Sequence, residues 1–208
     1  MKKFNLLLTA AMAFFCNLHA QKTNVGLFAG PVFAKTNMKV IDEKSDFTFL
    51  PGIYTGVFLD MPVGKKLTVQ SGVNYVQKGF MEKFDDAKVT MRLHYLEIPV
   101  NLVWYSALQQ KGFYVGAGPS FSFGVAGRAK YKDGGEEYSE KVNFGEDDDM
   151  KGADIAGNVT TGYTFENGIS LGAVANFGLI NLGTSADTKI HNNYFALKVG
   201  YVFRQKSK

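Results

Sequence analysis

The chain has 208 residues, a length that predicts one domain with room for a sizeable core. Charged residues make up 20% of it and aromatic residues 14%, and the formal net charge is +4. The cations are spread over several segments and form no single basic stripe, so the composition gives no support to a nucleic-acid-binding protein.

The first twenty residues have the layout of a secretory signal peptide. Two lysines precede an apolar run from Leu6 to Phe15, and the small residue Ala20 ends the segment. The apolar run has about half of the ~20 residues that a membrane-spanning helix requires. We therefore expect residues 1–20 to direct export and to be removed after Ala20, which leaves residues 21–208 as one domain.

Eight later segments of roughly ten residues alternate with period 2, which is typical of strands. The third segment is the cleanest, because Leu67, Val69 and Val73 point to one side while Gln70 and Asn74 point to the other. In chain order, the predicted strands are residues 23–35, 50–62, 67–79, 95–105, 112–127, 153–165, 168–182 and 193–203.

The connections between these strands alternate in length. Residues 63–66, 106–111 and 166–168 are short turns. An even number of antiparallel strands with alternately long and short connections is typical of up-and-down barrels in the bacterial outer membrane, whose long connections form the outer loops. The long, polar connections are residues 36–49, 80–90, 128–152 and 183–192.

Alternation alone does not say which face of the strands is inside. A soluble lipocalin-like barrel points its apolar face inward, whereas a membrane barrel points it toward lipid. Here the polar face is mainly Gly, Ser, Thr and Asn, and its isolated charges are Glu97, Asp154 and Lys198. We predict an all-β, eight-stranded antiparallel up-and-down transmembrane β-barrel with a filled polar interior; a soluble ligand-binding barrel is the alternative. Eight strands leave no room for an aqueous pore.

Glu97 lies in the segment YLEIPVNLVWY, on the face opposite Leu96 and Ile98. An ionised carboxylate inside a barrel costs free energy unless it is paired and hydrogen-bonded. Strand parity and approximate height predict Lys198 as the partner of Glu97, with Arg128 and Lys35 as alternatives. Glu97→Ala would then leave a buried cation unpaired and weaken the barrel. The alternative to this structural role is a functional one, in which Glu97 takes part in a proton relay or in transport.

Two further features concern the strand ends and the hydrogen-bond ladder. Proline removes a ladder donor, so we expect bulges at Pro31, Pro99 and Pro119. Aromatic residues near the expected strand ends predict an interfacial girdle. Its predicted members are Trp104, Tyr105, Tyr163, Phe165, Tyr201 and Phe203.

Four segments resemble the PorT-like outer-membrane β-barrel proteins of Bacteroidota: YLEIPVNLVWY, GFYVGAGPSFSFGV, NGISLGAVANFGLINL and the terminal KVGYVF. The resemblance covers about residues 21–203. It implies an outer-membrane barrel, but membership of that family assigns no single biochemical activity.

Few residues have catalytic or metal-binding potential. Beyond the first twenty residues the histidines are His94 and His191, and no serine stands in a nucleophile-elbow context. The acidic run EDDD (146–149) lacks the alternating ligands of a calcium loop. We predict no catalytic residue, no cofactor and no metal site; a small outer-membrane enzyme that modifies lipid A through His94 or His191 is the alternative.

The expected role is therefore structural or binding, with four outer loops presented to a partner or to the cell surface. Outer-membrane lipid and lipopolysaccharide are the expected contacts, and a protein that binds residues 128–152 is a further option. We expect a monomer that binds no nucleic acid.

Overall fold

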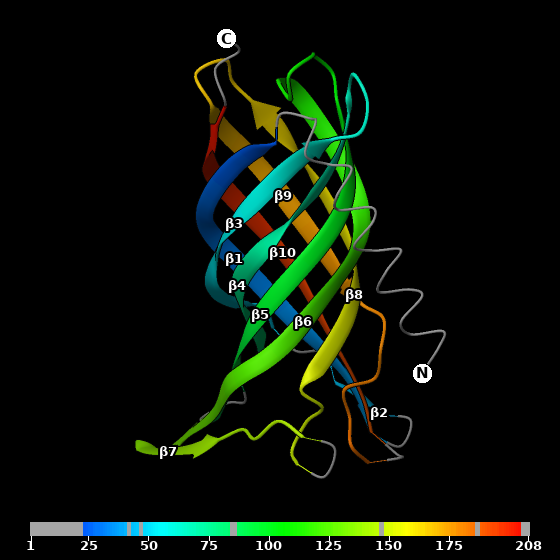
Figure 1. Ribbon diagram of the computed structural model, residues 1–208. Helices are drawn as coiled ribbons and strands as arrows, with labels where there is room; N and C mark the ends of the chain where they lie inside the picture. Colours follow the sequence, from blue (N-terminus) through cyan, green and yellow to red (C-terminus); the bar gives the residue numbers. More distant parts are fainter. Residues whose placement is uncertain are drawn as a thin grey trace, which may run out of the picture.

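The computed structural model describes residues 23–40, 43–45, 48–83, 87–145, 148–185 and 188–204. The predicted signal peptide and its cleavage after Ala20 lie outside these residues. Ten strands form one sheet (Figure 1). They are β1 (Asn24–Val40), β2 (Glu43–Ser45), β3 (Leu50–Pro62), β4 (Leu67–Lys83), β5 (Ala87–Tyr105), β6 (Gly112–Asp133), β7 (Glu136–Lys141), β8 (Ala153–Thr164), β9 (Ile169–Gly178) and β10 (Thr188–Phe203).

Eight of these strands close into an antiparallel barrel. The sheet runs in the order β10-β9-β8-β6-β5-β4-β3-β1, and β1 pairs with β10 to complete the ring. The short strands β2 and β7 pair with β1 and β6 outside the ring. The prediction of an eight-stranded up-and-down barrel is therefore confirmed. No described residue belongs to a helix long and apolar enough to cross a membrane.

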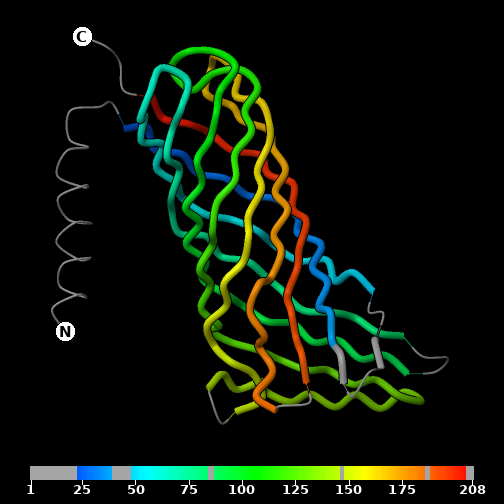
Figure 2. Tube along the Cα trace, turned by 90° about the vertical axis from the view of Figure 1, so that its right-hand side faces the viewer, coloured from blue at the N-terminus to red at the C-terminus, as the bar shows by residue number. Residues whose placement is uncertain are grey.

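The two ends of the barrel differ (Figures 1 and 2). At one end, called here the short-turn end, three tight connections join the strands, β1 begins and β10 ends. At the other, called the loop end, several strands continue well past the ring. Much of the sequence expected to be loop is strand there: β1 extends to Val40, β6 extends to Asp133, and β7 lies within residues 128–152. Antiparallel pairing thus rigidifies segments whose polar composition indicated loops.

The alternation of the strands sorts the side chains into two faces. Large apolar side chains cover the outside of the barrel, for example Leu27, Val57, Leu102 and Phe177, each about half exposed. Polar residues are buried inside, among them Asn74, which lies on the same ladder as the outward-facing Val73. This is the inverse of a soluble barrel, in which the apolar face fills the interior. The apolar outer wall requires a lipid surrounding.

The expectation of bulges at the prolines was wrong. The register is continuous past Pro31, Pro99 and Pro119. Each proline instead lies where the pairing with one of the two neighbouring strands is interrupted over two residues. In the β1–β10 pairing, for instance, Gly30 and Pro31 are unpaired, and the pairing resumes at Val32 in the same register. The strand loses a hydrogen bond there without gaining a residue. The register shift in the ring lies elsewhere, between His94 and Tyr95 opposite β6.

Glycine lets the backbones approach closely beside these prolines. A Cβ on Gly118, next to Pro119, would lie 1.9 Å from the carbonyl oxygen of Val100. A Cβ on Gly30, next to Pro31, would lie 2.0 Å from the carbonyl oxygen of Leu197. At both positions any larger residue would collide with the backbone of the neighbouring strand.

Candidate functional site

The half of the barrel interior nearer the loop end is built around Lys78. Its ammonium nitrogen lies 2.9 Å from Asp154 Oδ2 and 3.8 Å from Glu97 Oε2, and all three side chains are fully buried. It also donates a hydrogen bond to Ser122 Oγ at 3.0 Å. The rings of Tyr95 and Tyr194 flank the same nitrogen, with centroids 4.9 Å and 5.7 Å away.

The barrel register explains why these groups meet. Glu97 on β5 pairs with Ser122 on β6, which pairs with Asp154 on β8, so the three side chains form one inward-facing row. Glu97 also accepts hydrogen bonds from Tyr194 Oη at 2.8 Å and from Ser122 Oγ at 3.3 Å. The row is therefore a hydrogen-bonded network in which one cation, Lys78, offsets the negative charge of both carboxylates.

The predicted partner of Glu97 was wrong. Lys78 occupies that place, while Lys198 lies among the rings of Phe28, Phe58 and Tyr114, with centroids 5.5 to 6.0 Å from its nitrogen. The alternative Arg128 is exposed on an outward-facing strand position. Lys78 shares the parity of Gln70 and Asn74, so the alternation did mark it as inward. It was missed although it lies within the predicted segment 67–79, because its contact with Glu97 depends on the register between strands.

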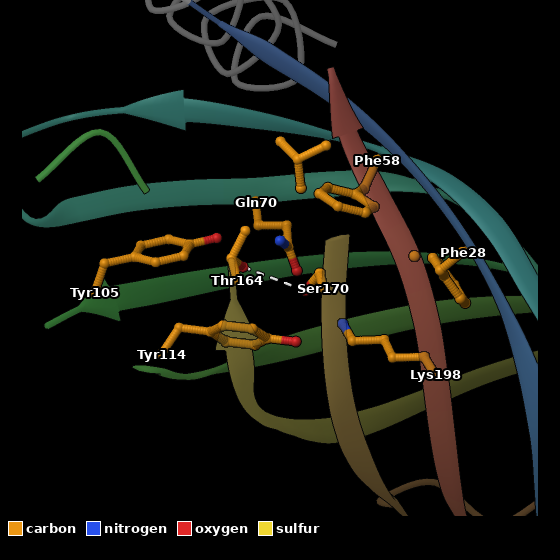
Figure 3. A pocket seen from close by; sticks show the side chains of 10 residues that line it. Phe28, Phe58, Gln70, Tyr105, Tyr114, Thr164, Ser170 and Lys198 are labelled. Carbon is orange, nitrogen blue, oxygen red and sulfur yellow. Dashed lines mark hydrogen bonds between the residues drawn. The ribbon is translucent and has the colours of Figure 1, made fainter. Parts of the chain in front are cut away.

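The half of the interior nearer the short-turn end contains a second polar group (Figure 3). Asp60 accepts hydrogen bonds from Gln70 Nε2 at 2.8 Å and from Tyr105 Oη at 3.1 Å. Lys198 points into a cavity of about 10 Å³ lined also by Gln70 and Tyr114. That volume is at the lower limit for one water molecule. The described side chains therefore fill this part of the barrel.

Tyr105 does not belong to the predicted girdle. It is 2% exposed and faces the interior, because it has the parity of Glu97 and not that of Trp104. The other predicted members, Trp104, Tyr163, Phe165, Tyr201 and Phe203, are 40–51% exposed at the short-turn end of the wall. Phe113, which was not predicted, is equally exposed at the start of β6.

The two histidines lie apart from the buried carboxylates. His94 has outward parity on β5, and its Nδ1 is hydrogen-bonded to Tyr75 Oη. His191 is on β10, opposite Asn37 of β1. No group of three or more potential metal ligands occurs among the described residues. Of the acidic run, Glu146 and Asp147 lie outside the described residues, and Asp149 Oδ2 accepts a hydrogen bond from the backbone of Asn143.

A second candidate site lies outside the barrel. Beyond the ring, residues 79–83 of β4, 87–92 of β5, 128–133 of β6 and β7 pair side by side, and we call them the extended sheet. Its β6–β7 edge runs sideways from the loop end in both views (Figures 1 and 2). The tight turn at Gly134 and Gly135, both with positive φ, closes this edge hairpin.

The extended sheet has two chemically different faces. Tyr131 pairs with Tyr138 on the face that continues the barrel interior, and the two side chains are 41% and 61% exposed. The acids of this tyrosine face are Glu82, Asp133, Glu136 and Glu140. The opposite face continues the outer wall, and we call it the basic face; its cations are Lys83, Lys88, Arg92, Arg128, Lys130, Lys132 and Lys141.

The closed eight-stranded ring, the apolar wall and the polar interior together define a transmembrane β-barrel of the bacterial outer-membrane type. The sequence also matches the family model described as "Outer membrane protein beta-barrel domain" over residues 19–183. The chain belongs to this family of outer-membrane proteins.

Several solved structures resemble the chain at low sequence identity. Ail, the attachment invasion locus protein of Yersinia pestis, is 13% identical, with 88% of this chain and 99% of that chain covered and a TM-score of 0.47. Neisserial surface protein A is also 13% identical, with 86% and 97% covered and a TM-score of 0.49. OprG from Pseudomonas aeruginosa is 12% identical, with 89% and 98% covered and a TM-score of 0.41. No curated protein matches the sequence.

Proposed function

We propose that this protein is a non-enzymatic outer-membrane barrel that presents the extended sheet to a protein partner at the cell surface. The observation that carries the proposal is the exposed Tyr131–Tyr138 pair at the projecting edge. Rigid aromatic side chains are the commonest anchors of protein interfaces, and acids around them add selectivity for charge. The partner would therefore present an apolar pocket with basic side chains at its rim.

Other parts of the proposal extend the sequence predictions. Cleavage after Ala20 would release a monomer surrounded by outer-membrane lipid and lipopolysaccharide. The segments shared with PorT-like proteins of Bacteroidota support membership of that narrower group. The filled interior supports a structural barrel over a pore, because the described cavities each have a volume of about 10 Å³.

A crosslinking experiment tests the partner-binding role. A photoreactive residue in place of Tyr138 is expected to capture a surface protein in intact cells, and one in place of Leu108, which is 56% exposed at the short-turn end, is not. Tyr131→Ser should lower the yield of the Tyr138 adduct at least about tenfold, since an aromatic anchor contributes ~2 kcal/mol. Tyr131→Phe, which keeps the ring, should preserve it. A yield unchanged by Tyr131→Ser would contradict the role of the tyrosine face.

A second experiment tests the non-enzymatic part. The double variant His94→Ala/His191→Ala is expected to give the same lipid A mass profile as the wild type. The reason is geometric: His94 faces the outside of the barrel and bonds to the Tyr75 hydroxyl, and His191 lies on another strand. A mass shift that appears in the variant would establish the enzymatic alternative.

A further inference from the structure

The cations of the basic face are arranged in rows across four strands. Lys83, Lys88 and Lys132 occupy directly paired positions, and the next residue in that row is Glu137. Four positions closer to the barrel, Arg92, Arg128 and Lys141 are paired in the same way. Lys130 lies between the two rows, opposite Thr90 and Ser139.

This arrangement leaves a large excess of positive charge on one face. Like charges directly opposite on neighbouring strands destabilise a sheet. Among the described residues of this face, one acid offsets the seven cations: Glu137, whose carboxylate lies 3.1 Å from Lys130 Nζ. The hydrogen bond from Lys130 holds the pKa of Glu137 below its ordinary value. Such an excess is stable when an external anion lies against it.

The basic face begins at the height of the lipid headgroups. Val125 is the last large apolar side chain on the outside of β6, and Arg128 follows three positions later. At about 3.3 Å per residue and a strand tilt of ~40°, Arg128 lies about 8 Å above Val125 along the membrane normal. The headgroup layer on each side of a bilayer is about 5–8 Å thick. Long arginine and lysine side chains reach across the remaining distance.

The direction of the extended sheet turns this face toward the membrane. The β6–β7 edge leans away from the side of the barrel in Figure 1, and Figure 2 shows it running across the loop end. When a strand leans outward, the face that continues the outer wall turns toward the membrane surface, and the opposite face turns toward the medium. The basic face is therefore directed at the headgroups, and the tyrosine face remains open to a protein.

We propose that the basic face binds the phosphate groups of phosphorylated lipids in the outer leaflet. Arginine offers a planar pair of donors that matches two phosphate oxygens, and the lysines add mobile point charges. In the row nearest to the apolar wall, Arg128 and Lys141 contact the phosphates first. Arg92 of the same row donates hydrogen bonds to the backbone oxygen of Pro51 and to Gln77 Oε1. The proposal goes beyond the partner-binding role, because it concerns the other face of the extended sheet. It does not depend on whether the tyrosine face binds a protein.

Lipid binding by the full chain in neutral detergent micelles tests this proposal. The probes are purified diphosphoryl lipid A and the same lipid after enzymatic removal of its phosphates, both quantified on the protein by native mass spectrometry. The wild type should bind the phosphorylated probe at least about tenfold more tightly. Its binding should weaken as salt rises from 50 to 500 mM, because exposed charges are screened.

A triple variant locates the site. Arg128→Gln/Lys132→Gln/Lys141→Gln removes three cations of the basic face and leaves the Lys130–Glu137 pair intact. It should bind diphosphoryl lipid A about a hundredfold less tightly, since each cation near an anionic surface contributes about fivefold. The matched control, Lys65→Gln/Lys66→Gln/Lys111→Gln, removes three cations at the short-turn end and should bind as the wild type does. Heat-modifiable gel migration verifies that each variant is folded.

Three results would overturn the proposal. One is equal affinity of the wild type for the phosphorylated and dephosphorylated probes, a measurement that needs no variant. Another is a triple variant that binds the phosphorylated probe as tightly as the control does. The third is displacement of lipid A by a soluble sulfated glycan at equimolar concentration, which would assign the face to surface polysaccharide. None of these results bears on crosslinking through Tyr138.

Discussion

Replacing Lys78 with methionine is expected to lower the free energy of unfolding by about 3–5 kcal/mol. Methionine has a similar length and fills the same space, but it leaves Glu97 and Asp154 as two buried carboxylates without a cation. Denaturant unfolding of the folded barrel in detergent micelles measures the effect. Lys65→Met, at an exposed turn, is the matched control and should stay within about 0.5 kcal/mol of the wild type.

The same measurement tests the composition of the network. Because Asp154 keeps Lys78 paired when Glu97 is removed, Glu97→Ala should cost less than Lys78→Met. A double-mutant cycle should give a coupling of about 1–3 kcal/mol between Lys78 and Glu97, and less than about 0.5 kcal/mol between Lys198 and Glu97. Adding Glu97→Gln and Asp154→Asn to Lys78→Met should restore most of the lost stability, since no buried charge remains. A Lys78→Met barrel as stable as the wild type would show that the network contributes nothing.

The second large effect is expected at Gly118. A methyl group at this position would lie 1.9 Å from the carbonyl oxygen of Val100 and 2.9 Å from the Cα of Asn101, both backbone atoms of β5. The neighbouring strand cannot move away without loosening the ring, so Gly118→Ala should destabilise the barrel by about 3 kcal/mol or prevent its closure. The folded fraction on unboiled gels and the unfolding midpoint both report this.

Gly157 is the matched control for Gly118. It lies on β8 directly opposite Pro119, and a Cβ placed on it has no atom within 4 Å. Gly157→Ala should therefore leave the unfolding midpoint unchanged within about 0.5 kcal/mol. If the two alanine variants were equally stable, the close approach beside Pro119 would have no energetic role.

The sequence was sufficient for the architecture of the ring. Period-2 alternation located all eight of its strands, and the bounds of β3 (Leu50–Pro62) agree with the predicted segment at both ends. The small and uncharged residues of one face indicated which side looks inward. These features depend on neighbours along a strand, so a single sequence contains them.

The features that could not be predicted from the sequence depend on contacts between strands. Lys78 lies nineteen positions before Glu97, and their contact follows from the register of β4, β5 and the strands beyond them. The basic face is built from cations two positions apart on β6 and four positions apart on β5, together with Lys83 and Lys141. Along the chain these cations alternate with Tyr131, Met91 and other residues of the opposite face, so no basic stripe is visible. Pairing between strands is what gathers them.

The extra residue of β6 at the register shift near His94 and Tyr95 has a consequence for how this protein can change over generations. Between the shift and the short-turn end, an inserted or deleted residue would exchange the inward and outward faces of a strand and prevent the ring from closing correctly. On the loop-end side of the shift, the β6–β7 hairpin ends in an exposed turn. Equal numbers of residues added to both strands of this hairpin would lengthen it without changing the apolar wall of the barrel. The turn at Gly134 and Gly135 is therefore a place where the chain can gain length while the register of the eight ring strands stays the same.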